Sequence, residues 1–216
     1  MDFMFVFLLL PFLIYWCINE KAGIQLSIVF ILTIWIILLF KNLEIKFSNG
    51  GEIFWIIIAV MFLIYHFLHK KIIELLSMGG FRVCMLVTAI ISFIMILYRP
   101  NIEFIYCGGL FLGMGAGYCF NRRYVGFNSA NVLDKKGIIK YLFLVIRFIL
   151  GVGVLVLILY RVEKMMHVIA ESQNLILYNF LCCMAVSLWV FILAPWVFIK
   201  LRFAGAGKLD MADDKQ

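Results

Sequence analysis

The chain has 216 residues, of which 66% are apolar and only 14% are charged. Soluble domains are roughly 45 to 50% apolar and about 25% charged, so this composition excludes a water-soluble globule. The mean hydropathy of +1.09 and several nearly uncharged runs of sixteen or more residues are typical of a protein embedded in a bilayer. We therefore expect an all-α integral membrane protein.

Seven apolar runs predict seven transmembrane helices. The runs cover residues 3–18, 22–40, 53–68, 83–98, 104–120, 141–160 and 176–201. Several are close to the lower length limit for crossing the hydrocarbon core, so flanking residues must extend them. The first run follows Asp2 rather than a basic segment, and we expect it to be retained rather than cleaved as a signal. Because no linker separates the runs, residues 1–203 are expected to form one polytopic domain and 204–216 a short polar cytoplasmic tail.

The distribution of Lys and Arg predicts the orientation of the chain. We assign the loops alternately to the two sides of the membrane. Thirteen of the nineteen Lys and Arg residues then lie on the side of residues 19–21, 69–82, 121–140 and the C-terminal tail, and five lie on the other side. The remaining one, Arg147, lies inside a predicted helix. The positive-inside rule then predicts a multi-pass inner-membrane protein with its N-terminus outside and its C-terminus in the cytoplasm. The net charge of +7 suits anionic lipid head groups, so no nucleic-acid partner is expected, and no particular protein partner is indicated.

Three cations of the outer side are candidate phosphate ligands. Lys41 ends the second predicted helix, Lys46 follows in the loop at 41–52, and Arg99 begins the loop at 99–103. Phosphoryl chemistry needs such cations together with a nucleophile and an acid. The alternative interpretation is that each cation is an interface anchor whose charged head snorkels to water.

The histidines and cysteines do not make up a complete metal site, although His66 and His69, spaced i, i+3, share one helical face. His66 and His69 lie at the inner end of the third predicted helix, with no carboxylate or cysteine beside them. His167 follows Arg161 in an outer polar stretch, where we expect a solvated loop histidine. The six cysteines fall in or beside apolar runs and are expected to be buried, inert packing residues. No metal or cofactor is expected.

Three features inside predicted helices concern packing. Arg147 lies six residues into the sixth helix, about 9 Å along it, and either snorkels to the inner surface or has a buried partner. In the fifth helix, Gly109, Gly113 and Gly117 repeat every four residues and predict close helix packing. Pro195 predicts a kink or an end late in the seventh helix.

Three segments resemble a known membrane family. They are residues 8–41, LLLPFLIYWCINEKAGIQLSIVFILTIWIILLFK, residues 108–127, GGLFLGMGAGYCFNRRYVGF, and residues 194–203, APWVFIKLRF. The first resembles the helix pair before the first motif of the bacterial type 2 phosphatidic acid phosphatases. The others resemble that family's glycine-rich helix, the charged turn after it and its closing helix. Because these are membrane phosphatases of lipid phosphates and isoprenyl diphosphates, the resemblance implies a lipid-phosphatase-like helical bundle.

The first two catalytic motifs of that family are incomplete in this chain. The first is a Lys followed seven residues later by Arg-Pro. Lys41 matches the Lys, but Ser48 and Asn49 occupy the Arg-Pro positions. The second motif is Pro-Ser-Gly-His, and its nearest counterpart keeps the Gly as Gly50 but has Gly51 in place of the His.

The third motif, a Ser-Arg pair followed by a His and an Asp, should end just before Gly108. Residues 94–107 read IMILYRPNIEFIYC and contain neither His, Asp nor Ser-Arg. The resemblance implies that the third-motif His attacks phosphorus and the second-motif His protonates the leaving group, so both are missing.

We therefore predict a degenerate, inactive relative that contacts membrane lipids and binds a phosphorylated lipid or isoprenyl phosphate at the outer leaflet. Two alternatives remain open. One is an active hydrolase with unusual site residues, for which His167 is the outer histidine available. The other is a small transporter or accessory subunit, in which Arg147 and the glycine face line a path or an interface.

Overall fold

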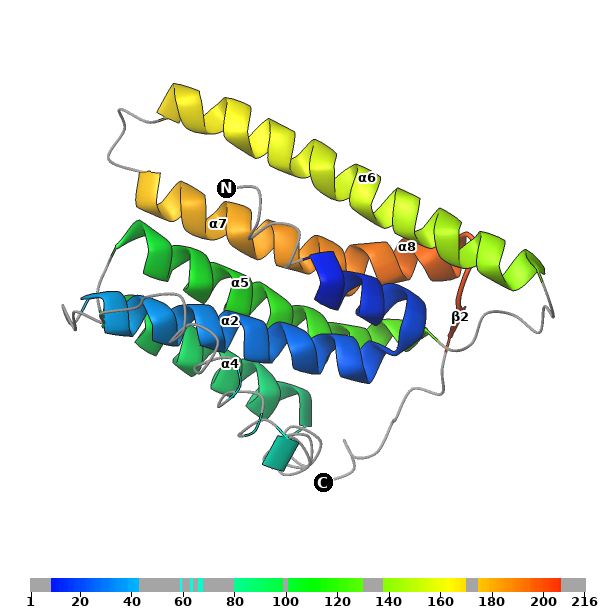
Figure 1. Ribbon diagram of the computed structural model, residues 1–216, viewed down its shortest axis with the longest axis horizontal. Coiled ribbons are helices and arrows are strands. Elements are labelled where there is room, and N and C mark those ends of the chain that lie inside the picture. Colours follow the sequence, from blue (N-terminus) through cyan, green and yellow to red (C-terminus); the bar gives the residue numbers. More distant parts are fainter. Residues whose placement is uncertain are drawn as a thin grey trace.

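The computed structural model describes residues 9–42, 59, 63, 66–67, 80–98, 101–129, 138–169 and 175–206. Their elements, with η for π-helix, are η1 (Ile14–Ile18), α2 (Glu20–Asn42), α4 (Gly80–Leu97), α5 (Ile102–Phe120), η2 (Asn121–Val125), β1 (Phe127–Asn128), α6 (Ile138–Ile169), α7 (Leu175–Leu188), η3 (Trp189–Leu193), α8 (Ala194–Lys200) and β2 (Gly205–Ala206). The protein is a helical membrane bundle whose long helices lie side by side (Figure 1).

Five helical segments of the described residues are long and apolar enough to cross a membrane. They are Glu20–Phe40, Gly80–Leu97, Ile102–Val125, Tyr141–Met165 and Leu175–Lys200. Each coincides with one predicted apolar run. The first predicted run forms a shorter apolar helix over Leu9–Ile18. The predicted helix at 53–68 lies outside the described residues except for four positions, so the total of seven stays a prediction.

The bundle has two ends, which we call the tied end and the distal end. The tied end holds the starts of α2, α4 and α6 and the ends of α5 and α8, and the distal end holds the opposite termini and the start of α7 (Figure 1). Gly23 near the start of α2 packs against Tyr15, which contacts Asn121 just after α5, so α2 and α5 are antiparallel. α2 therefore ends where α5 begins, as the alternate assignment of loops predicts.

α5 lies between α4 and α7 and presents glycines to both. A Cβ on Gly109 would lie 2.7 Å from the Phe180 oxygen, and one on Gly113 would lie 2.6 Å from the Met184 oxygen. A Cβ on Gly117 would lie 2.6 Å from the Cβ of Phe191 in η3. These are the glycines whose four-residue spacing predicts close packing, and their contacts show that α5 and α7 run parallel. Without side chains there, the two backbones approach closely, which favours association in lipid.

Gly108 and Gly115 face the opposite way, towards α4. A Cβ on Gly108 would lie 2.6 Å from Ile96, and Gly115 packs against Thr88. Ser92 adds a hydrogen bond by donating to the Gly108 oxygen over 2.8 Å. α5 is therefore held through its backbone on two faces.

A disulfide joins Cys84 of α4 to Cys119 of α5 near the tied end. The prediction that all six cysteines are inert packing residues is therefore wrong for this pair, although both are buried. The two residues are 35 positions apart, and only the antiparallel pairing of the two helices brings them together. No spacing rule in the sequence could have shown it.

The late break in the last span follows from Pro195. A proline has no N–H, so it cannot donate to the carbonyl of Phe191 in an α-helix or to that of Val190 in a π-helix. Both carbonyls are instead captured by side chains of the N-terminal helix, because Trp16 Nε1 donates to Val190 O over 2.9 Å and Tyr15 OH donates to Phe191 O over 3.4 Å. The predicted break is thus a π-helix, η3, that docks another helix.

The chain after α8 is part of the fold. Ala204 is buried, and β2 pairs antiparallel with β1, with Phe127 opposite Ala206 and Asn128 opposite Gly205. Residues 204–206 are therefore packed against the bundle, and the predicted division into a domain and a cytoplasmic tail stays a prediction.

Candidate functional site

Arg147 lies at the centre of a polar cluster at the tied end. Its side chain is fully buried. Its Nε donates to Phe203 O over 2.8 Å, and Nη1 donates to Trp16 O over 3.1 Å and to Ser129 O over 3.3 Å. Nη2 also donates to Phe203 O. Of the two interpretations of Arg147, the structure shows the buried partner, and that partner is a set of backbone carbonyls from three separate segments.

Glu20 and Ser129 form the second part of this cluster. The Glu20 carboxylate accepts hydrogen bonds from Ser129 N over 3.1 Å and from Ser129 Oγ over 2.6 Å. The Glu20 amide in turn donates to Ser129 Oγ over 3.0 Å. This reciprocal pair joins the start of α2 to the segment after β1, and a charged acceptor makes such bonds roughly twice as strong as neutral ones.

Asn121 completes the cluster from the start of η2. Its Nδ2 donates to the Tyr15 hydroxyl, and its Oδ1 accepts from Phe127 N over 3.1 Å. Arg147, Ser129, Asn121 and Tyr15 are all buried, and their donors are used within the fold. We call these residues and Glu20 the polar knot. Arg147 therefore uses its donors on backbone carbonyls of the fold.

Of the three predicted phosphate ligands, the structure describes only the backbone of Lys41, which lies at the distal end. Lys41 lies in the last turn of α2, and its side chain lies outside the described part of the chain. Lys46 and Arg99 lie outside the described residues. Asn101 caps α5 by accepting from Ile102 N over 2.9 Å, so the chain after Arg99 enters α5 at the end where Lys41 leaves α2.

His167 is part of a helix, which corrects the expectation of a loop histidine. α6 runs on to Ile169, nine residues past the predicted end at 160, and carries the His167 backbone to the distal end; its side chain lies outside the described residues. His69 lies outside them too. Among the described residues, no group of three His, Cys, Asp or Glu side chains could hold a metal ion.

Two buried donors in the distal halves of their helices were not predicted. Asn179 of α7 is 1% exposed, and neither its Nδ2 nor Trp35 Nε1 of α2 has a hydrogen-bond partner among the described residues. Native folds leave few such groups unpaired, because each costs about 1 to 3 kcal/mol. An isolated Asn or Trp in an apolar run has no sequence signal that would show this.

Comparison with known families identifies the later half of the chain. The family described as PAP2 superfamily phosphatase, transmembrane extension, matches residues 105–206. These residues run from the first turn of α5 to the last residue of β2. They are similar to the transmembrane extension of PAP2 superfamily phosphatases. No curated protein and no solved structure matches the chain.

The matched boundaries agree with the fold. The extension begins as α5 begins and closes where β2 pairs with β1. The loops at 41–52 and 99–103, where the resemblance places the eroded catalytic motifs, precede the matched segment. The match therefore supports a membrane relative of the PAP2 phosphatases and does not test whether catalysis has been lost.

Proposed function

We propose that this protein binds a phosphorylated lipid or an isoprenyl phosphate at its distal end and does not hydrolyse it. The observation that carries the proposal is the antiparallel arrangement of α2 and α5. It brings the end of α2, with Lys41, to the end of the bundle where the chain passes from Arg99 into α5. Attraction of a phosphate to such cations requires no proton transfer, so binding can persist without catalytic histidines.

Asn179 Nδ2 and Trp35 Nε1, which have no partner in the described part of the chain, support a ligand site at the distal end. Asn179 lies four residues after the start of α7 and Trp35 seven residues before the end of α2, so both lie within about 10 Å of the distal end at ~1.5 Å per residue. A bound polar group at this end would give buried donors a partner. On the orientation predicted from the Lys and Arg distribution, the distal end faces the exterior of an inner membrane.

A phosphate-release assay tests the loss of catalysis. The purified protein is incubated with phosphatidic acid, phosphatidylglycerol phosphate and undecaprenyl diphosphate in turn, and we expect no turnover of any of them. Lys41→Ala is the decisive variant, because phosphate release by the wild type that disappears in Lys41→Ala would refute the proposal. Lys21→Ala, which removes an exposed cation at the tied end, is the matched control.

A specific observation favours one alternative, an active hydrolase that uses His167. His167 and Lys41 are carried by helices that reach the same end of the bundle, so an active hydrolase could use this imidazole. It predicts measurable phosphate release that His167→Ala abolishes while the thermal stability of the protein is unchanged. Wild-type inactivity, or activity indifferent to His167→Ala, removes this alternative.

A further inference from the structure

An open groove lies between α6 and α7 towards the distal end. It has a volume of about 320 Å³ and is lined by Val154, Leu157, Ile158, Arg161, Val162, Met165 and Tyr178. This volume falls at the lower end of the range of about 300 to 1,000 Å³ found for ligand sites. Six of the seven residues come from α6, and α7 closes the groove with Tyr178, whose hydroxyl donates to Val162 O over 3.4 Å.

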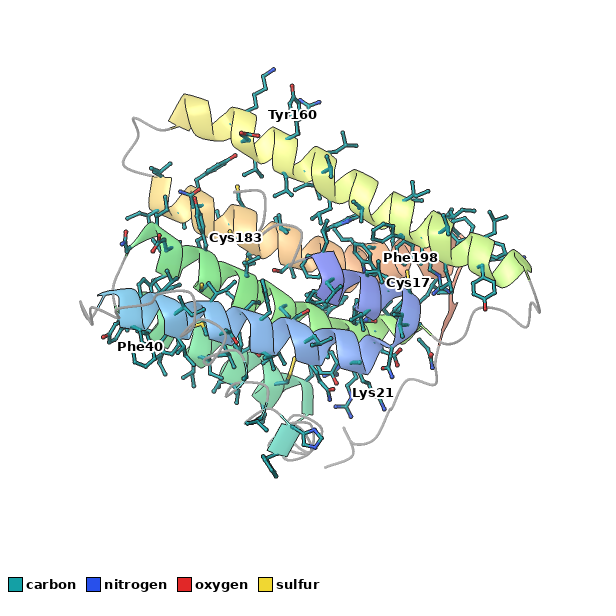
Figure 2. All side chains as sticks on the ribbon, in the orientation of Figure 1. Cys17, Lys21, Phe40, Tyr160, Cys183 and Phe198 are labelled. Atoms are coloured by element: carbon teal, nitrogen blue, oxygen red, sulfur yellow. A yellow bond between two sulfur atoms is a disulfide. The ribbon has the colours of Figure 1, made fainter. Side chains whose placement is uncertain are left out.

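The depth of the groove in the bilayer follows from two tyrosines of α6. Tyr141 and Tyr160 are 69% and 61% exposed, and Tyr160 projects away from the bundle (Figure 2). At ~1.5 Å per residue they are about 28 Å apart, close to the ~30 Å thickness of the hydrocarbon core. Exposed tyrosines mark the two membrane interfaces. Val154 to Ile158 therefore lie inside the hydrocarbon region, and Arg161 lies at the level of the head groups.

The chemistry of the lining matches this depth. The part of the groove below Tyr160 is aliphatic, and Arg161 is the lining cation, at the interface. Arg161 is exposed and forms no ion pair with a carboxylate of the described residues. Basic groups at the mouth of a groove between transmembrane helices are suited to anionic head groups, and a groove open to the bilayer at this depth admits an acyl chain.

We propose that this groove holds one acyl chain of an anionic bilayer phospholipid, whose phosphate is bound by the Arg161 guanidinium. An arginine can bind a phosphate with two parallel hydrogen bonds, and the chain fills the aliphatic groove below it. The site uses other residues than Lys41 and stands whether or not the distal end binds a phosphorylated ligand in the manner proposed above.

Native mass spectrometry tests this site. The full chain is reconstituted in vesicles of phosphatidylglycerol and phosphatidylcholine, extracted in detergent, and its retained lipids are counted. We expect the wild type to keep one phosphatidylglycerol. Arg161→Gln should lower the preference for phosphatidylglycerol over phosphatidylcholine about tenfold, because it removes a charge-assisted contact. Lys164→Gln, which removes an exposed cation of α6 outside the groove lining, should have no effect.

A second pair of variants tests the acyl-chain site. Leu157→Trp places a large ring in the groove and should abolish retention of either lipid, whereas Ile149→Trp, at a residue of nearly equal exposure (64% against 62%) outside the groove lining, should retain it. Excess inorganic phosphate should not displace the lipid, and Lys41→Ala should leave it bound. Absence of a retained lipid from the wild type, or equal retention by Leu157→Trp and Ile149→Trp, would overturn the proposal. Displacement by inorganic phosphate would overturn it too, since the groove would then hold no chain.

Discussion

Replacing Arg147 by methionine is expected to destabilise the bundle strongly. Methionine keeps an unbranched apolar stem but has no donors, so the carbonyls of Trp16, Ser129 and Phe203 would lose the partner that the structure gives them. Each unsatisfied carbonyl costs about 1 to 3 kcal/mol in a buried site, although hydrogen bonds in membrane proteins average nearer ~0.6 kcal/mol. We therefore expect a loss of about 3 to 5 kcal/mol in the free energy of unfolding.

For a chain of this size each kcal/mol corresponds to about 2 to 4 °C, so the melting temperature should fall by about 10 °C. Intrinsic tryptophan fluorescence during heating in detergent measures it, because Trp16 and Trp189 are both hydrogen-bonded within the fold. Lys164→Met, an exposed cation of the same helix, should change the melting temperature by less than about 2 °C. If Arg147→Met melts within 2 °C of the wild type, the polar knot does not hold the tied end together.

Two further substitutions and one labelling experiment test the helix packing, the backbone at Arg202 and the disulfide. Gly113→Leu should prevent α5 from packing on α7 and abolish the monodisperse peak in size-exclusion chromatography, whereas Gly153→Leu, with no atom within 4 Å of its Cβ position, should leave that peak intact. Equal behaviour of the two variants would contradict the packing described above. Arg202→Gly should raise the free energy of unfolding by about 1 kcal/mol, because Arg202 has a left-handed φ of 60° that a glycine adopts without strain; a lower melting temperature would argue against it. Under denaturing, non-reducing conditions, maleimide should modify only four of the six cysteines, because Cys84 and Cys119 are bonded; modification of all six would show that the bond does not form.

The long helices could be predicted because bilayer physics requires them. An uncharged run of sufficient length has few alternatives to a membrane helix, and the four-residue glycine spacing on α5 is a local pattern. The presence of Pro195 could also have indicated the free carbonyls of Val190 and Phe191, because a proline has no N–H to donate to the carbonyl four or five residues before it. Which groups capture those carbonyls could not be predicted, because Tyr15 and Trp16 are more than 170 positions away in the sequence.

The polar knot could not be predicted either, because its residues lie far apart in the sequence. Glu20 and Ser129 are 109 positions apart, and neither carries a periodic signal. Arg147 is unusual in the sequence because a charged residue in a membrane helix is costly. Its partners, however, are backbone carbonyls, which every residue has, so no side-chain pattern could identify them.

The most direct test of the proposed function determines which lipid remains on the protein. The wild type and Lys41→Ala are incubated in vesicles that contain phosphatidic acid, and native mass spectrometry then identifies the lipid bound to each. We predict that the wild type retains one intact phosphatidic acid more than Lys41→Ala does, because a lipid held in the groove at Arg161 stays on both proteins. Diacylglycerol in place of phosphatidic acid, or equal retention by both proteins, would contradict the proposal.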